Sequence, residues 1–112
     1  VELHFGHLYL PSSFLSPLIN RRKDGYGGSI DNRSRLVREI AEHVRTVVGD
    51  QIAVIAKLDM DDGVPGSIWI DEALRTAQLL DAATGTLDWD HLPPVQTGLH
   101  VAEDKVVRAW TP

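Results

Sequence analysis

The stretch Ile52 to Leu58, IAVIAKL, constrains the fold of this chain more than any other. It is apolar at every position except Lys57. A strand with one solvent face alternates apolar and polar residues, whereas a strand buried on both faces of a parallel sheet is apolar throughout. Amphipathic helices are predicted on either side of this stretch. The resulting order of strand, helix, strand and helix predicts an α/β fold with a parallel sheet.

The two helices carry their own boundary and packing signals. Ser29 is predicted to cap the first helix, Asp31 meets its positive end, and Gly49 ends it. The second is predicted from about Asp71 to Asp81. Apolar side chains recur at helical spacing at Leu36, Val37, Ile40, Ala41, Val44, Val47 and Val48, and again at Ile70, Ala73, Leu74, Ala77 and Leu80. Each helix therefore has one face that can pack on a sheet.

A cluster of polar rings follows the first predicted strand, residues 1–4. His4, His7 and Tyr9 open a loop that runs to about Gly28, with a short helical turn expected near its middle. Two imidazoles three residues apart can converge on one acceptor oxygen and polarise a carbonyl group. A tyrosine, with an ordinary pKa of about 10, is protonated at neutral pH and can act as a proton donor. The cluster is therefore a candidate catalytic site.

Other interpretations of the polar residues stay open. The rings can be ordinary loop side chains with structural hydrogen bonds. Zinc bound at His4 and His7 would need further ligands, and the chain has no cysteine. Asp59, Asp61 and Asp62 resemble the ligands of a calcium loop, but the distal glutamate of such a loop is missing. We therefore predict no metal site.

Lys57 is a lone cation near the carboxyl end of an apolar strand. Such a charge costs stability unless it finds a partner. One interpretation places the partner in an active site, because the carboxyl ends of barrel strands build the active site. The alternative is a side chain that reaches solvent or pairs with Asp59.

Length and composition exclude several classes of protein. The chain has 112 residues, no cysteine and a net charge of −5. Nucleic acid is not expected as a partner, because phosphate binding requires a basic face. Without cysteine there is no disulfide and no thiolate catalysis. No apolar run approaches the 18 or so residues of a membrane span, and no signal peptide pattern is present, so no membrane partner and a cytoplasmic location are expected.

The segment from His4 to Arg35 keeps its residues in a characteristic order. The order is His4-x-x-His7-x-Tyr9-Leu10, then Phe14-Leu15-Ser16-Pro17, then Asn20-x-Arg22-x-Asp24-x-Tyr26-Gly27-Gly28-Ser29, and finally Asn32-Arg33-x-Arg35. It resembles the old yellow enzyme family, the flavin-dependent NADH:flavin oxidoreductases or ene-reductases built on a TIM barrel. The resemblance continues more loosely to about Ala82.

The resemblance implies cofactors, a substrate and residue roles. FMN and NAD(P)H would be the cofactors, and an α,β-unsaturated carbonyl compound (an enone) the substrate. His4 and His7 would hydrogen-bond the carbonyl oxygen, and Tyr9 would protonate the α-carbon while reduced flavin gives hydride to the β-carbon. Lys57 would lie beside the flavin ring, where the family commonly has an arginine; lysine keeps the charge but loses the bidentate fork.

Two further expectations concern the surroundings of the rings. Phe5 and Leu8 stand where the family commonly has small residues, so they are expected to crowd the pocket. The run from Asn20 to Gly28, together with Arg33 and Arg35, is predicted to be scaffold: the glycines permit a tight turn, and Arg22 with Asp24 can tie the loop down.

A complete (β/α)₈ barrel needs about 250 residues. We therefore predict a partial TIM (β/α)₈ barrel, with about two βα units in residues 1–85 and a divergent tail in residues 86–112, where 86–89 could start another strand. One functional hypothesis is an FMN-dependent oxidoreductase that reduces the C=C bond of enones, present as an incomplete chain. The other is a non-catalytic truncated fragment that cannot bind FMN alone. Exposed sheet edges would give either form a route to self-association.

Overall fold

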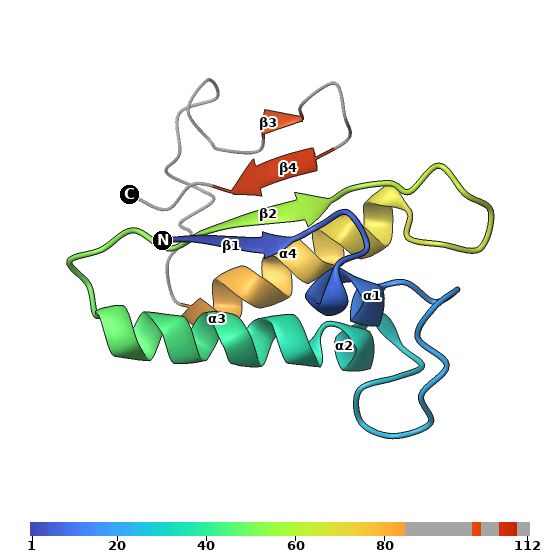
Figure 1. The fold of residues 1–112 in the computed structure, drawn as a ribbon, viewed down its shortest axis with the longest axis horizontal. Helices are drawn as coiled ribbons and strands as arrows, with labels where there is room; N and C mark the ends of the chain where they lie inside the picture. The colour runs from blue at the N-terminus through green and yellow to red at the C-terminus, as the bar shows by residue number, and fades with distance from the viewer. Residues whose placement is uncertain (85–99, 102–105, 110–112) are drawn as a thin grey trace.

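The fold is built on a sheet with two parallel strands. The computed structural model describes residues 1–84, 100–101 and 106–109, and for the last two stretches only the backbone. The strands are β1 (Glu2–Phe5), β2 (Ile55–Asp59), β3 (His100–Val101) and β4 (Val106–Ala109), in the order β1-β2-β4-β3 (Figure 1). β1 and β2 run parallel, with His4 opposite Lys57. The prediction of an α/β fold with parallel strands is confirmed.

The strand on the other side of β2 departs from the all-parallel pattern. β4 pairs with β2 in the antiparallel direction, and β3 pairs with β4 in the same way. A parallel neighbour would need a long crossover connection, whereas β3 and β4 are joined by only four residues, 102–105, which suits an antiparallel pair. The predicted strand start at residues 86–89 lies outside the described residues.

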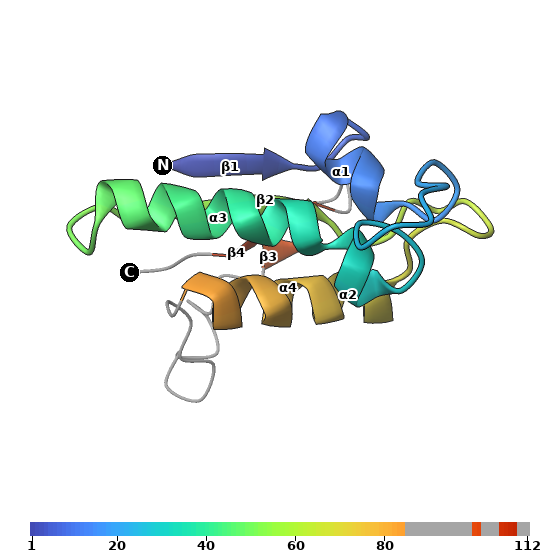
Figure 2. The same ribbon diagram turned by 90° about the horizontal axis from the view of Figure 1, so that it is seen from below.

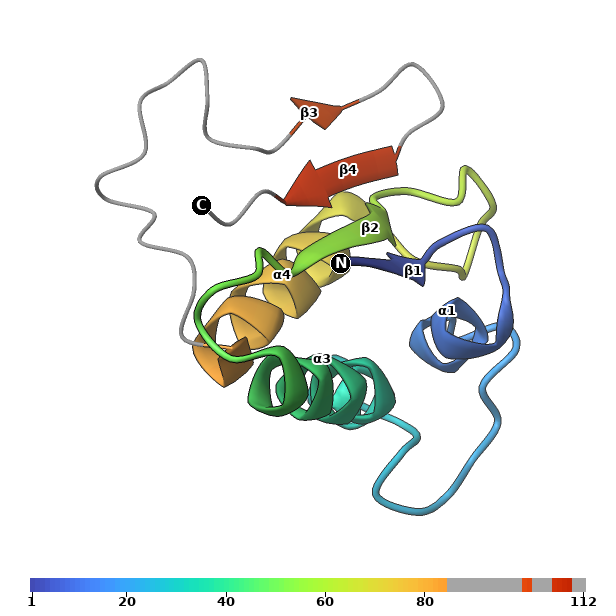
Figure 3. The same cartoon turned by 60° about the vertical axis from the view of Figure 1, so that its left-hand side comes forward.

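Helices cover one face of this sheet. They are α1 (Leu10–Leu15), α2 (Ile30–Arg33), α3 (Arg35–Val48) and α4 (Ile70–Thr84). α3 and α4 contact each other and run side by side, in the direction opposite to β1 and β2 (Figure 2). Both lie on the same side of the sheet (Figure 3). Each parallel strand is thus followed by a helix that packs back on it.

The boundaries of the first long helix follow the predicted signals, with one interruption. The Ser29 hydroxyl accepts a hydrogen bond from the Asn32 amide, and Gly49 ends α3 with φ 65°. Ser34 separates α2 from α3, although one continuous helix was expected. Its hydroxyl donates to the Asp31 carbonyl at 3.2 Å, and such back-bonding competes with regular helix geometry.

The core lies between the sheet and the helices. Its buried members are Phe5, Leu15, Val37, Ala41, Leu58, Met60, Ile68, Ala73, Ala77 and Leu80. The predicted face of the first helix is buried only in part: Val47 is 71% exposed, because α3 extends past the amino end of β1 (Figure 1). On α4, Ile70 and Leu74 are likewise exposed.

The prediction that the strand from Ile52 to Leu58 is buried on both faces is wrong. The strand begins at Ile55, and Ile55 and Lys57 are only half-buried. Leu58 packs against the helices, and side chains alternate between the two faces of a strand. Lys57 therefore points to the face opposite the helices. In the part of the chain that the structure describes, no helix or strand covers that face.

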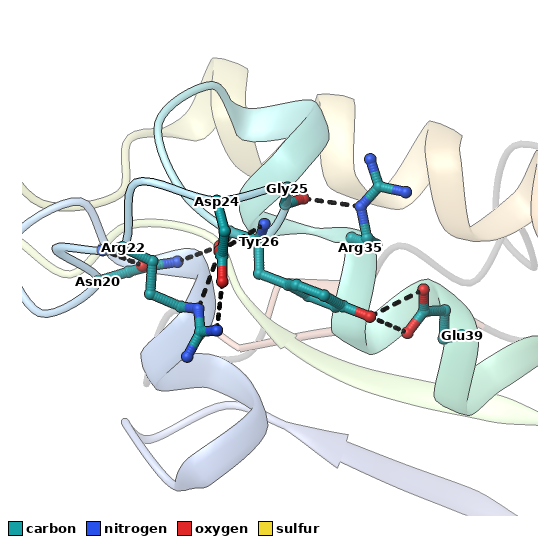
Figure 4. Close-up of polar contacts among 7 residues, drawn as sticks. All are labelled: Asn20, Arg22, Asp24, Gly25, Tyr26, Arg35 and Glu39. Atoms are coloured by element: carbon teal, nitrogen blue, oxygen red, sulfur yellow. Dashed lines mark hydrogen bonds and ion pairs between the residues drawn. The ribbon is translucent and has the colours of Figure 1, made fainter.

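The long loop before α2 is fastened by its own polar side chains, as predicted for scaffold (Figure 4). Asn20 donates from Nδ2 to the carbonyls of Phe14 and Tyr26, at 2.7 and 2.6 Å. Arg22 forms an ion pair with Asp24, which holds the pKa of that carboxyl below its ordinary value. The loop is therefore a defined part of the fold.

Gly27→Ala is expected to lower the free energy of unfolding by about 3 kcal/mol. A Cβ atom there would lie 2.1 Å from the carbonyl oxygen of Arg22, and backbone cannot yield as a flexible side chain does. Overpacking of this kind costs about 1–3 kcal/mol or more. Gly25→Ala is the matched control, because its nearest neighbours would be Arg35 side-chain atoms 3.6 Å away. Equal urea midpoints for the two variants would contradict the prediction.

Candidate active site

The three predicted ring residues come together at the carboxyl end of β1. The ring centroids of His4 and His7 are 5.2 Å apart, with the ring planes at 88°. Those of His4 and Tyr9 are 5.3 Å apart, at 79°. His4 is thus the centre of the cluster, and the other two rings each meet it edge to face. All three side chains are exposed, so a small molecule can reach them.

The hydrogen bonding of His4 sets which of its nitrogens can donate. The Gly6 amide donates to His4 Nδ1 at 3.3 Å. A neutral imidazole has one donor and one acceptor nitrogen, so Nδ1, which accepts, carries no proton. Nε2 of neutral His4 therefore carries the N–H group, and among the described residues this donor has no partner, so it can bind a carbonyl oxygen.

The backbone that carries His7 is strained. His7 and Leu8 have φ values of 59° and 55°, the only positive values at non-glycine residues in the described part of the chain. This left-handed conformation costs an ordinary residue about 1–2 kcal/mol. It is held by hydrogen bonds: the Ser12 hydroxyl contacts the carbonyls of Gly6 and Tyr9, both at 3.0 Å, and the His7 amide donates to Asp59 Oδ2 at 2.6 Å.

Asp59 is the site residue whose role the sequence did not reveal. It is the last residue of β2 and is only 9% exposed. Burial raises the pKa of its carboxyl group, the hydrogen bond from the His7 amide opposes that rise, and the charge of Asp62 adds to it. Its position at the carboxyl end of a strand was the one available signal.

Asp59→Asn is expected to stabilise the protein at neutral pH. The carboxyl pKa is raised on folding, so the folded state favours the protonated form, and the ionised form costs stability above the raised pKa. This cost decreases as the pH falls toward 3.8, the ordinary pKa of an aspartate carboxyl group. Asparagine keeps an acceptor for the His7 amide and carries no charge. Urea unfolding should show that Asp59→Asn raises the free energy of unfolding, and that this gain becomes smaller as the pH falls. The surface variant Asp50→Asn should show no gain. A gain for Asp59→Asn that does not depend on pH would refute this account.

Lys57 lies next to the ring cluster. It is opposite His4 in the parallel ladder, so both side chains point to the face of the sheet opposite the helices. It is half-buried, and among the described residues it forms no ion pair. The alternative interpretation, a pair with Asp59, is not observed, because the Asp59 carboxylate is turned to the His7 amide.

A cavity of about 500 Å³ opens beside the strained turn. Leu8 and His7 form part of its wall, with Ile19 and Val64 from the loops and Asp59 from the strand end. Leu8 lines this space, and its crowding of the substrate pocket stays a prediction. The same expectation for Phe5 is wrong: its side chain is 2% exposed and lies in the core, on the helix side of the sheet.

The described residues also bear on metal binding and on membrane insertion. No group of three or more His, Asp or Glu side chains among them could hold a metal ion, the aspartates 59, 61 and 62 included. In the same part of the chain, none of the helices has the length and apolar character needed to cross a membrane.

Comparison with known proteins supports the resemblance seen in the sequence. The profile of the NADH:flavin oxidoreductase / NADH oxidase family matches residues 1–107, which extends past Ala82, where the visible resemblance ended. A 4,4'-dithiodibutanoate disulfide reductase of Rhodococcus erythropolis is 49% identical over 88 residues, covering 79% of this chain and 22% of that protein. An NADPH dehydrogenase of Bacillus licheniformis is 36% identical over 109 residues, covering 88% of this chain and 32% of that protein.

A solved structure is similar in fold as well as in sequence. A complex of 2-naphthoyl-CoA reductase with 2-naphthoyl-CoA superposes with a TM-score of 0.72 at 35% identity, covering 74% of this chain and 13% of that one. The chain thus spans less than a third of these relatives. The predictions of an oxidoreductase family, and of FMN and NAD(P)H as its cofactors, are confirmed for the family as a whole. The chain belongs to the NADH:flavin oxidoreductase / NADH oxidase family.

Proposed function

We propose that this chain is part of an FMN-dependent oxidoreductase that uses NAD(P)H to reduce the C=C bond of α,β-unsaturated carbonyl compounds. One observation carries the proposal: His4, His7 and Tyr9 converge at the end of a parallel strand, with Lys57 beside His4 in the neighbouring strand. Relatives named NADPH dehydrogenase and NADH oxidase support the cofactors.

The roles follow from the chemistry of each side chain. His4, through Nε2–H, and His7 hold the carbonyl oxygen and draw electron density from the double bond. This makes the β-carbon electrophilic. The Tyr9 hydroxyl gives its proton to the α-carbon; the side chain is 62% exposed, so a substrate can approach it. FMN, when bound, supplies the hydride.

The residues present fit one edge of a flavin. Lys57 is half-buried and unpaired among the described residues, on the uncovered face of the sheet beside His4. A cation in such a place can stabilise the negative charge of a reduced flavin ring. Lys57 would therefore hold the ring, while His4 holds the substrate next to it.

The fold proposed for the whole protein is a TIM (β/α)₈ barrel, with two of its βα units in residues 1–85 and a divergent tail in residues 86–112. Barrels of this kind place their active sites at the carboxyl ends of the strands. The ring cluster and the Asp59 carboxylate are both at that end of β1 and β2.

The second candidate function is a non-catalytic fragment that cannot bind FMN alone. Its support is the edge of the sheet: among the described residues, β1 pairs with β2 on one side and with no strand on the other. An open edge of this kind invites pairing with another chain. Self-association would then be expected, with no flavin retained.

FMN binding to the purified chain separates the two candidates. The enzyme proposal predicts flavin absorbance that co-elutes with the chain in gel filtration, and FMN fluorescence that is quenched on titration. Lys57→Met should weaken that binding, whereas Lys23→Met, at an exposed loop lysine, should leave it unchanged. A colourless chain that does not quench FMN would favour the fragment. Equal affinities for the two lysine variants would exclude Lys57 from the flavin site.

A further inference from the structure

We infer that Asp59 is a positioning residue that sets the orientation of the His4 and His7 imidazoles. The inference deepens the proposed function, on which its catalytic meaning rests, but its structural content can be tested without flavin. The carboxylate joins the end of β2 to the turn after β1: its Oδ2 accepts the His7 amide across 52 residues of sequence. No sequence motif in the ring cluster includes it.

The hydrogen bond from the His7 amide to Asp59 matters for His7 because the backbone conformation of the turn at His7 and Leu8 is otherwise unfavourable. His7 and Leu8 are both in the left-handed region, which favours glycine or asparagine. An amide that donates to a carboxylate forms a charge-assisted hydrogen bond, about twice as strong as a neutral one. The carboxylate therefore holds a backbone conformation that directs the His7 ring toward His4.

Gly6 extends the same control to His4. Its amide donates to His4 Nδ1, and its carbonyl accepts from Ser12. A Cβ atom at Gly6 would lie 2.6 Å from Asp59 Oδ1 and 3.5 Å from His4 Cε1. The Asp59 carboxylate thus packs against Gly6, which lies between His4 and His7 in the sequence and has no side chain to block this contact. One acid group fixes both donors.

The test is NMR on the full chain without flavin. In the parent protein, the chemical shifts of the His7 amide proton and of the Asp59 carboxyl carbon should change with pH and have the same midpoint. The reason is that the amide proton senses the charge of the carboxyl group that accepts it. Proton contacts between the His4 and His7 rings should persist in Asp59→Asn, which keeps an acceptor, and be lost in Asp59→Ala. Asp62→Ala is the matched control, because the Asp62 carboxylate bonds Ser67 and not the turn.

Each outcome decides the inference. A His7 amide that ignores the Asp59 midpoint overturns it, as do ring contacts that survive in Asp59→Ala. Should Asp59→Ala fail to fold, the parent titration and the Asn variant still give the answer. A chain that binds no FMN but passes these tests would leave the positioning role standing while the proposed function fails. If the chain binds FMN but the contacts between the His4 and His7 rings are unchanged in Asp59→Ala, the positioning role fails while the proposed function stands.

Discussion

Replacing Arg33 by methionine is expected to lower the free energy of unfolding by about 3 kcal/mol, because removing one partner of a buried ion pair typically costs 3–5 kcal/mol. Methionine keeps the apolar stem and removes the guanidinium group. The lower end of the range applies because the side chain of the partner, Glu72, is 28% exposed, whereas that of Arg33 is 4% exposed. Urea unfolding followed by circular dichroism measures the loss.

The size of this effect comes from the number of acceptors that one guanidinium satisfies. Arg33 donates to both carboxylate oxygens of Glu72 on α4, to the Leu15 carbonyl at the end of α1, and to the Gly28 carbonyl at 3.0 Å. It therefore joins three segments that are distant in sequence. Without it, a half-buried carboxylate and two carbonyls lose their partner.

A neighbouring pair supplies the control. Arg75 bonds Asp31 at 3.0 Å, but both side chains are about half exposed, so Arg75→Met should cost at most about 1 kcal/mol. Adding Glu72→Gln to Arg33→Met should restore part of the loss, because it removes the unpaired charge. If the two arginine variants unfold at the same urea concentration, the buried pair does not have the importance assigned to it.

Tyr9→Phe, in flavin-loaded protein, is expected to slow reduction of an enone by about 10²–10⁴-fold, the usual contribution of a positioned proton donor. Phenylalanine keeps the ring that meets His4 at 5.3 Å and removes the hydroxyl. Reduction of the flavin by NAD(P)H needs no proton from this side chain, so its rate should not change. Stopped-flow absorbance resolves the two half-reactions.

Tyr26→Phe is the matched control for the loss of a phenol. The Tyr26 hydroxyl donates to Glu39 at 3.0 Å, which raises its pKa, and it belongs to the scaffold loop (Figure 4). Its loss should leave both half-reactions near their parent rates. A Tyr9 variant that slows both half-reactions equally, or neither, would remove Tyr9 from the role of proton donor.

Local signals in the sequence predicted much of this fold. Ser29 caps α2 and Gly49 ends α3, as predicted for the two ends of this helical segment, because a hydroxyl cap and a left-handed stop depend on neighbouring residues alone. The ring cluster was identified for a similar reason, since its members lie within six residues of one another. Arg22 with Asp24 is also a local pair.

Contacts between distant segments were the features that escaped prediction. Asp59 reaches His7 from a strand that is 52 residues away in sequence, and no periodicity marks that carboxylate as a partner for a backbone amide. The antiparallel direction of β4 was hidden as well, because strand direction depends on connections and pairing rather than on composition. Exposure of Val47 depends on where β1 begins relative to the end of α3, which a helical pattern does not contain.

The pairing of β1 with β2 also determines when in folding the ring cluster can form. Helices such as α3 form within about a microsecond, whereas joining two strands separated by some fifty residues pays a loop-closure entropy first. We therefore expect the contact between Asp59 and the His7 amide to form late, after β1 and β2 have paired and the barrier is crossed. Asp59→Ala, which removes the acceptor of the His7 amide, should accordingly accelerate unfolding and leave the refolding rate almost unchanged.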